Sequence, residues 1–204
     1  MTEDIKQNIL KYVLDSSYKT NSISISYSLI NDKYFLLHIY NPNEDKIFLN
    51  KNNNVFFKKV CDMLFNQTEK QKGCFNHQHD DNSYVYKMDL SDLVNYFLKI
   101  EYSFIMVDIK TFEPISICCL VHNYIYNVCT NYHYRNQGKM EQLLNHLFKL
   151  IKMNKLKNGF HSEILLDIVF KNPQYKSVRE FYEKNYGFNF LRENDKKTIL
   201  KKVI

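Results

Sequence analysis

One glycine marks a place in this chain where chemistry could occur. Gly138 is one of only four glycines among 204 residues, and it separates the polar residues 131–137 from an apolar-periodic segment that begins at Met140. A strand that enters a glycine-containing loop and then a helix leaves backbone N–H groups unpaired, and the helix dipole adds a positive field. Such a junction binds anions, phosphate above all. Residues 136–140 are the predicted donors.

A second group of ligand-type side chains lies in residues 66–82, a polar segment that we expect to form a mobile loop. Cys74, His77, His79 and Asp80 follow a C-x2-H-x-H-D pattern whose side chains could bind zinc. A structural zinc site normally shows two well-spaced ligand pairs, and this segment has only one cluster. We therefore expect no metal here.

Hydrophobic spacing predicts the elements that position these groups. Apolar residues that recur every three or four positions indicate helices, and alternation indicates strands. The predicted helices span residues 4–14, 55–65, 140–151 and 174–186, with a further short helix capped by Asp89 or Ser91 and running to Leu98. The predicted strands span residues 22–29, 34–40, 102–109, 114–121, 124–130, 164–170, 188–192 and 198–203.

The order of these elements predicts an α/β fold. Three strands follow one another closely between residues 102 and 130, which favours an antiparallel meander. Residues 164–170 read ILLDIVF, the continuous apolar run of a central strand buried on both faces. The last two strands are expected to close the sheet as a hairpin.

Two segments carry a resemblance to a known family. The segment RNQGKM at residues 135–140 resembles the Q/R-x-x-G-x-G/A signature of the GCN5-related N-acetyltransferases (GNAT), whose loop cradles the pyrophosphate of acetyl coenzyme A. Downstream, LLDIVFKNPQYKSVREFYEKNYGF resembles the second family signature, a strand, an asparagine and a helix that ends in F-Y-x-K-x-GF. The two occur in the family's order, and the resemblance covers the last half of the chain. It implies a mixed, mostly antiparallel twisted sheet split by a cofactor cleft.

The resemblance also implies residue roles. The backbone of Val128, Cys129 and Thr130 would meet the pantetheine arm and polarise the thioester carbonyl. Tyr182 would protonate the departing thiolate, for which a phenol beside the sulfur is chemically suited. Asn172 would contact the coenzyme. The residues implied to hold the pyrophosphate are Arg135, Asn136, Gln137, Gly138, Lys139 and Met140.

The chain departs from the family pattern in two places. Met140 stands where the family has a small residue, so its side chain must turn away from the phosphates or the loop must widen. The strand positions at which family members often carry an acidic or histidine base hold Tyr124, Tyr126 and Asn127. The remaining candidates for the base are a water held by Tyr126 and Asn127, His122, and Asp167.

Plainer interpretations stay open for each of these residues. Gly138 could serve only as the glycine turn of a helix N-terminus. Tyr182 is one of 16 tyrosines and lies beside Phe181 on an apolar helix face, so it could simply pack in the core. Asn172 precedes Pro173 and could be a helix cap.

The charge of the chain permits but does not favour nucleic-acid binding. The formal net charge is +6, yet only three of the 28 basic residues are arginines and the lysines are scattered. Lysine-rich residues 196–202 lack the planar forks that read bases and phosphates, and a scattered lysine surface usually serves solubility. The positive field would instead attract an anionic small molecule.

The cysteines and the apolar runs bear on location. Five cysteines, including the adjacent Cys118 and Cys119 inside a strand-like run, do not form the framework of a secreted protein, and a reducing compartment is expected. No stretch reaches the roughly 18 apolar residues of a membrane span, and the N-terminus lacks a signal-peptide core. We therefore expect a cytoplasmic protein without a membrane partner.

The sequence as a whole predicts one acetyltransferase domain over residues 1–204. Residues 1–99 would supply an extra N-terminal helix and strand, the first strand and the acceptor-side helices, with the polar loop beside the acceptor pocket, and residues 100–204 the acetyl-CoA-binding core. The expected reaction is acetyl transfer to a primary amine of a small molecule, such as an anionic amino sugar or sugar nucleotide. The alternatives are a catalytically inactive acyl-CoA-binding module, a protein or peptide N-acetyltransferase, and a nucleic-acid or protein-interaction domain; a homodimer is compatible with the sequence.

Overall fold

The computed structural model describes residues 24–40, 55–65, 67–68, 71–72, 74, 100–153, 162–169 and 174–204. The predicted helices at residues 4–14 and before Leu98 lie outside these ranges. The helices are α2 (Val55–Phe65), η1 (Tyr132–Tyr134), α4 (Lys139–Lys152) and α5 (Tyr175–Tyr186). The strands are β1 (Ser24–Leu29), β2 (Tyr34–Tyr40), β3 (Gln67–Thr68), β4 (Gln71–Lys72), β5 (Tyr102–Asp108), β6 (Pro114–Val121), β7 (Tyr124–Thr130), β8 (Glu163–Val169), β9 (Asn189–Glu193) and β10 (Lys197–Val203).

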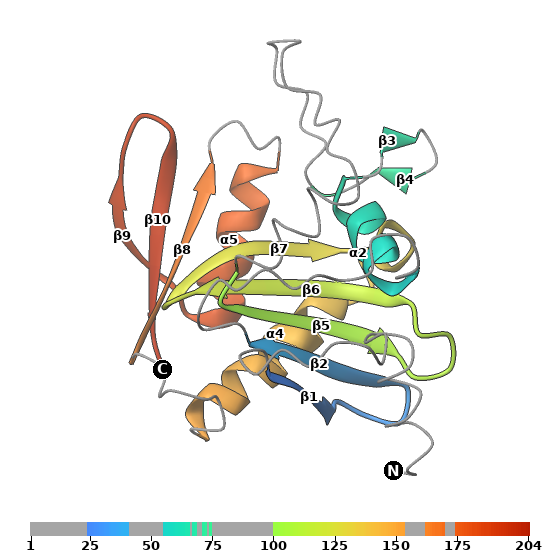
Figure 1. Cartoon of the computed structure of the whole chain (residues 1–204). Helices are drawn as coiled ribbons and strands as arrows, with labels where there is room; N and C mark the ends of the chain where they lie inside the picture. The colour runs from blue at the N-terminus through green and yellow to red at the C-terminus, as the bar shows by residue number, and fades with distance from the viewer. Residues whose placement is uncertain are drawn as a thin grey trace.

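Eight strands form one sheet in the order β1-β2-β5-β6-β7-β8-β10-β9. All neighbours are antiparallel except β7 and β8, which run parallel (Figure 1). Short connections explain the antiparallel part, because tight turns can join only antiparallel neighbours, whereas the parallel step requires the crossover through α4. The expected meander of β5, β6 and β7 and the closing hairpin of β9 and β10 are both confirmed.

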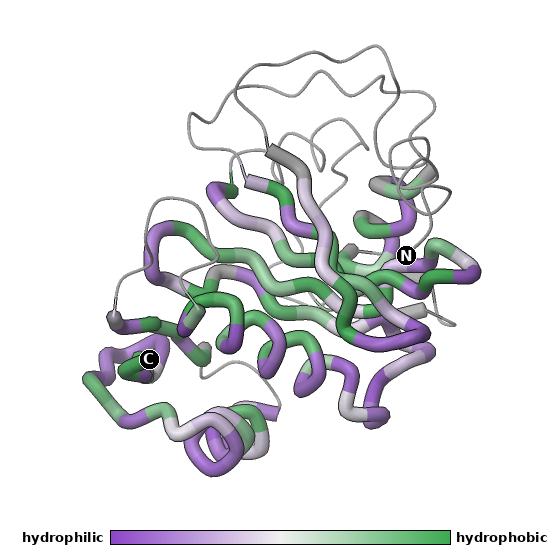
Figure 2. Tube along the Cα trace, turned by 90° about the horizontal axis from the view of Figure 1, so that it is seen from below, coloured by the Kyte–Doolittle hydropathy of each residue, from purple (hydrophilic) through white to green (hydrophobic). Residues whose placement is uncertain are grey.

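The sheet is covered on both faces because its inner strands are apolar on both sides. Even-numbered side chains of β5, such as Phe104 and Met106, pack with α4 and α5, while Ile105 and Val107 pack with α2. Figure 2 shows α4 and α5 on one side of the sheet and α2 on the other, with the hydrophobic stripe of α4 turned inward. This α/β arrangement confirms the predicted fold class.

The sheet divides between β7 and β8. The two strands are in register only at Tyr124 with Leu165 and at Ile125 with Leu166. Beyond these pairs they diverge, and Figure 1 shows them separating from a common point at the lower left. A β-bulge lies at the same place, because Leu120 pairs with Ile125 and Cys119 already pairs with Asn127, which leaves Tyr126 as the extra residue.

The polar segment after α2 is more ordered than expected. Within residues 66–82, β3 and β4 pair as a two-stranded sheet, and Cys74 forms a disulfide with Cys129 of β7. The prediction of a mobile loop is therefore wrong for this part, because polar composition does not reveal a covalent link to a distant strand. His77, His79 and Asp80 lie outside the described residues. None of the described helices is long and apolar enough to cross a bilayer.

Candidate active site

The loop between β7 and α4 is shaped by two left-handed residues. Asn131 ends the strand, and its side-chain oxygen accepts a hydrogen bond from the His133 amide at 3.2 Å, which starts η1. Asn136 then has φ +59° and Gly138 has φ +67°. Asparagine and glycine are the residues that tolerate this conformation. The single glycine is thus explained by a backbone turn that leads directly into α4.

The backbone amides of this turn point to no protein acceptor. Among the described residues, no hydrogen bond is donated by the amides of residues 136–140, and the first bond of α4 runs from Gln142 to the Gly138 carbonyl at 3.0 Å. A Cβ placed on Gly138 would meet no heavy atom closer than 4.0 Å, the distance to Glu141 Oε2. The space beside Gly138 is therefore open, and the unbonded N–H groups of residues 136–140 lie at the positive end of the helix dipole.

The edge of β7 that faces β8 carries unpaired backbone groups. The Asn131 amide donates to Ile115 of the preceding chain segment, at 2.8 Å. Because successive residues of a strand direct their backbone groups to alternate edges, the backbone of Cys129 also faces β6. The backbone groups of Val128 and Thr130 face the other edge, where β7 and β8 diverge, and we call this edge the opening. No described strand pairs with this part of β7. The amides of Val128 and Thr130 therefore line the opening, while the Cys129 backbone is part of the sheet.

Tyr182 is buried in the core beside this part of β7. The residue is 4% exposed and belongs to the same cluster as Cys118, which is paired with Val128, and Val128 packs against that cluster. Burial, with smaller effects from Cys118 and Tyr186, raises the pKa of the Tyr182 hydroxyl well above its usual value. Tyr182 therefore keeps its proton and can donate a hydrogen bond to a developing anion, but it does not act as a base.

Solved structures of acetyltransferases resemble this chain at low sequence identity. The chain is similar to an aminoglycoside 6'-N-acetyltransferase complexed with coenzyme A, at 15% identity over 76% of this chain and 94% of that chain, with a TM-score of 0.48. It is also similar to a GNAT-family acetyltransferase from Staphylococcus aureus Mu50 (16%, 75% and 96%, TM-score 0.46) and to the ribosomal-protein-S18-alanine N-acetyltransferase from Escherichia coli (20%, 50% and 68%, TM-score 0.39). No family model and no curated protein matches the chain.

The chain's own geometry decides the fold. A mixed sheet, mostly antiparallel, splits between two parallel strands, one strand is bulged at the split, and the glycine turn leads from that strand into the crossover helix. The chain therefore has the GNAT-like fold that the sequence predicts. In this fold β7 and β8 are the strands at the split, and α4 and α5 flank one face.

The side chains of the glycine turn are directed away from the open amides. Arg135 Nε donates to the Thr130 carbonyl at 3.1 Å, and its Nη2 lies 3.5 Å from Cys74 Sγ. Lys139 Nζ lies 4.4 Å from the centre of the Tyr34 ring, and Gln137 Nε2 donates to the His133 carbonyl. These contacts hold the shape of the turn, so the backbone rather than the side chains presents the positive charge.

Met140 resolves one of the two departures from the family pattern. Its side chain is half-buried and packs against the core cluster beneath α4. It therefore turns away from the open amides, and the larger residue does not fill the space that the family keeps free. Asn172, the other predicted contact of the coenzyme, lies outside the described residues.

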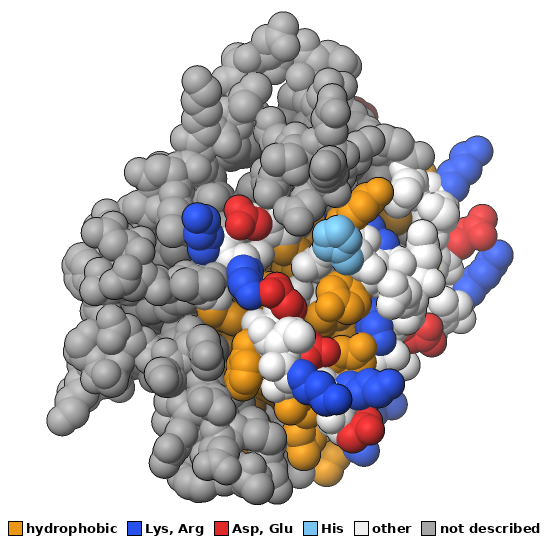
Figure 3. Space-filling model, turned by 90° about the vertical axis from the view of Figure 1, so that its right-hand side faces the viewer, with side chains coloured by type: hydrophobic (Ala, Val, Ile, Leu, Met, Phe, Trp, Pro, Cys, Tyr) orange, Lys and Arg blue, Asp and Glu red, His pale blue; other side chains and the backbone are white. Residues whose placement is uncertain are grey.

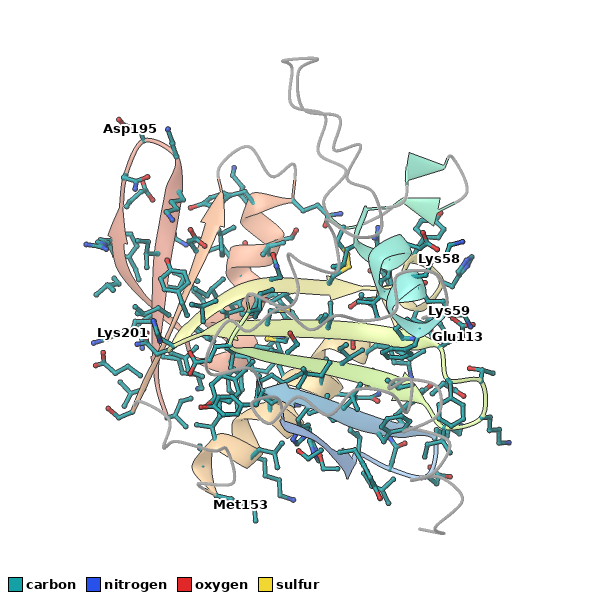
Figure 4. The ribbon with its side chains drawn as sticks, in the orientation of Figure 1. Lys58, Lys59, Glu113, Met153, Asp195 and Lys201 are labelled. Carbon is teal, nitrogen blue, oxygen red and sulfur yellow. A yellow bond between two sulfur atoms is a disulfide. The ribbon has the colours of Figure 1, made fainter. Side chains whose placement is uncertain are left out.

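The disulfide is the feature of the site that the sequence did not reveal. Cys74 and Cys129 are 55 residues apart and are joined beside α2, where Figure 4 shows the yellow bond. No cysteine pairing was predicted from the sequence, and this pair forms a disulfide, whereas Cys118 and Cys119 are free and buried as expected of strand residues. The disulfide connects the segment after α2 to the end of β7, next to the glycine turn.

The candidates for a base are placed very differently. His122 lies in the turn between β6 and β7, six residues from Val128, and its Nδ1 is 3.2 Å from Glu101. That places it at the opposite end of β7 from the open amides. Asn127 is 6% exposed and Tyr126 is the bulge residue. Asp167 is the first residue of β8 beyond the last pair with β7, and it is bonded to Lys197.

Proposed function

We propose that this protein is an acetyl-CoA-dependent N-acetyltransferase that acetylates a primary amine of a small molecule. The observation that carries the proposal is the row of unbonded amides at residues 136–140, beside an opening that is lined by Val128 and Thr130. A diphosphate fits the first group and an amide-containing arm fits the second. The two groups adjoin along one strand and one turn, as a long ligand requires.

The residues present suit coenzyme A. The turn offers N–H donors and no side chain at Gly138, which allows a phosphate to approach the backbone closely. Gln142 Oε1, a buried oxygen atom without a hydrogen-bond partner among the described residues, belongs to α4, the helix that starts at this turn. Unsatisfied buried polar atoms are rare in folded proteins, and a bound ligand is one explanation for them.

The residues of the turn and of β7 would bind the coenzyme, and Tyr182 would act at its sulfur. The five amides of the turn would bind the pyrophosphate, and the amides of Val128 and Thr130 would orient the pantetheine arm and polarise the thioester carbonyl. The acetyl group is supplied by the coenzyme as a thioester. Tyr182 would donate a hydrogen bond, and then its proton, to the sulfur as the carbon–sulfur bond breaks. The new amide nitrogen would release its extra proton to solvent, and Tyr182 would regain a proton from solvent. The amine must arrive without its proton, for which Asp167 or a water beside Asn127 and Tyr126 would serve.

The decisive experiment separates binding from turnover. Titration calorimetry with coenzyme A and acetyl-CoA measures binding, and thiol release with a panel of amines measures turnover. We expect micromolar binding, and we expect Tyr182→Phe to lower kcat about a hundredfold while leaving the Kd for coenzyme A within about twofold. Tyr186→Phe is the matched control, because Tyr186 is a buried tyrosine of the same helix whose hydroxyl has no hydrogen-bond partner among the described residues. An equal loss of kcat in both variants would remove Tyr182 from this role.

Three alternatives give different results in the same experiment. A binding module without activity would bind coenzyme A and acetylate none of the amines. A peptide N-acetyltransferase would prefer peptides over small amines. A nucleic-acid-binding protein would show salt-sensitive binding to DNA and no binding to coenzyme A. The face drawn in Figure 3 does not favour the last alternative, because acidic and basic side chains are interspersed among its described residues. Cytoplasmic location and a homodimer remain predictions.

A further inference from the structure

Four ionisable side chains from four neighbouring strands meet where β7 and β8 separate. They are Tyr124 of β7, Asp167 of β8, Lys197 of β10 and Arg192 of β9, and we call them the Asp167 cluster. Lys197 Nζ is hydrogen-bonded to Asp167 Oδ2. Arg192 and Asp167 both stand opposite Ile199 of β10, which places their side chains on the same face of the sheet. Burial is the main cause that raises the pKa of the Tyr124 hydroxyl; Asp167 raises this pKa further, and Lys197 and Arg192 lower it.

The cluster lies on the face of the split that is opposite to α5. Ile164, Leu166 and Ile168 point into the core beneath α4 and α5, so Asp167 points to the other face. Ile125 is part of the same core, so Tyr124 also points to that other face. Because Leu166 is the last residue of β8 paired with β7, Asp167 stands at the apex of the opening.

The cluster is accessible and carries both signs of charge. The Asp167 side chain is 24% exposed and that of Lys197 is 35% exposed, so the pair is partly desolvated but open to solutes. Two cations face one carboxylate, so one positive charge remains uncompensated within the cluster. A solute that brings an ammonium and an anion could replace the internal ion pair with two ion pairs of its own, at no loss of charge pairing.

We propose that the Asp167 cluster binds an acceptor whose primary amine lies within a few bonds of an anionic group, a carboxylate or a phosphate. Asp167 receives the ammonium, and Lys197 and Arg192 receive the anion. This inference rests on the proposed function, since it assigns the acceptor side of the same opening. It names the substrate class as zwitterionic amines and excludes polyamines, because a second ammonium would meet Lys197 and Arg192.

The chain contains a matched control for this site. Lys201 and Glu163 form a second ion pair between β10 and β8, at 2.9 Å, with the lysine 34% exposed. Lys201 lies four residues from Lys197, about 13 Å along the strand, at the end away from the opening. Figure 4 labels Lys201 at the lower left, where β8 and β10 converge with the start of β7. Removing its charge changes the net charge of the protein equally but leaves the Asp167 cluster intact.

The test compares amines that differ only in their anionic group. The pairs are O-phosphoethanolamine with ethanolamine, and β-alanine with β-alaninamide, each assayed with acetyl-CoA by thiol release. We expect kcat/KM to favour at least one anionic member by tenfold or more. Lys197→Gln and the exposed Arg192→Gln should each reduce that preference to threefold or less, while Lys201→Gln should retain it. Preference for phosphate or for carboxylate then identifies the anion.

Binding without the coenzyme separates this inference from the proposed function. Ligand-observed NMR should detect the preferred anionic amine on the protein alone, and Lys197→Gln should abolish the signal while Lys201→Gln preserves it. The inference is overturned if the anionic and neutral amines bind and react equally, if none of the four binds, or if Lys197→Gln and Lys201→Gln have the same effect. Absence of coenzyme A binding in calorimetry would instead overturn the proposed function and leave the zwitterion site standing.

Discussion

Acidification should destabilise this protein through His38, which lies between the sheet and α4. Ser28 Oγ of β1 is 3.0 Å from His38 Nε2 and 2.8 Å from His146 Nε2 of α4. The His38 ring also packs edge-on against Phe104. Burial, and secondarily the neighbouring His146, lowers the pKa of His38 from 6.5 to about 4. The folded protein thus holds His38 neutral where the unfolded chain protonates it.

The size of the effect follows from this shift in pKa. In the unfolded chain His38 takes up its proton as the pH falls below about 6.5, and in the folded protein only near about 4. The unfolded state therefore binds more protons between these values, and the free energy of unfolding falls as the pH falls through this window. Relative to high pH, the two pKa values lower the free energy of unfolding by about 0.2 kcal/mol at pH 7 and by about 2 kcal/mol at pH 5. His38 alone should therefore account for about 2 kcal/mol between these pH values.

Urea unfolding at pH 7 and pH 5 measures this contribution. Carboxylates also titrate below pH 7, so the native protein must be compared with His38→Gln, which removes the proton site and keeps a polar side chain. The informative quantity is the change in unfolding free energy between pH 7 and pH 5 in the native protein, minus the same change in His38→Gln. We expect about 2 kcal/mol for this double difference. His133→Gln, at an exposed position away from this contact, is the control substitution. A His38→Gln variant as pH-sensitive as the native protein would refute the reasoning.

Two further predictions concern the glycine turn and the disulfide. Glu141 Oε2 lies 4.0 Å from the Cβ position of Gly138, so its charge opposes an anion at the open amides. Glu141→Gln should therefore tighten coenzyme A binding about two- to fivefold in calorimetry, while the control Glu180→Gln on α5 should leave it unchanged. Weaker binding in Glu141→Gln would contradict a diphosphate at this place. The Cys74–Cys129 disulfide spans 55 residues, for which chain entropy predicts up to about 4 kcal/mol of stabilisation. Dithiothreitol should therefore lower the unfolding midpoint in urea of the native protein but not of Cys74→Ser, and an equal midpoint with and without the reductant in both proteins would show that the bond contributes nothing.

Local patterns predicted the elements well and the contacts between distant residues poorly. The helix after Gly138 follows from its periodic apolar face, and strands β5 and β6 follow from short apolar runs that are buried on both faces. The glycine turn follows from one residue type at one junction, since only the backbone conformation matters there. These are properties of short segments, which a single sequence contains in full.

The disulfide and the Asp167 cluster could not be predicted in this way. Cys74 and Cys129 meet only because α2 packs on the same face of the sheet as Cys129, and no spacing rule encodes that packing. Lys197 reads as one of many lysines until the register of β10 with β8 places it beside Asp167. Which backbone groups of β7 remain unpaired likewise depends on how far β8 runs beside β7, and this is a property of the whole sheet.

The narrow junction between β7 and β8 has a mechanical consequence. Strands β1, β2, β5, β6 and β7 form one part of the sheet and β8, β10 and β9 the other, and within the described residues two backbone-paired positions connect the two parts. A ligand bound between β7 and β8 would take the place of a paired strand and accept the backbone hydrogen bonds that β7 does not make to β8. Occupancy should then stiffen the hinge between the two parts, and hydrogen exchange at Val128 and Thr130 should slow more than at any amide of β2 or β5.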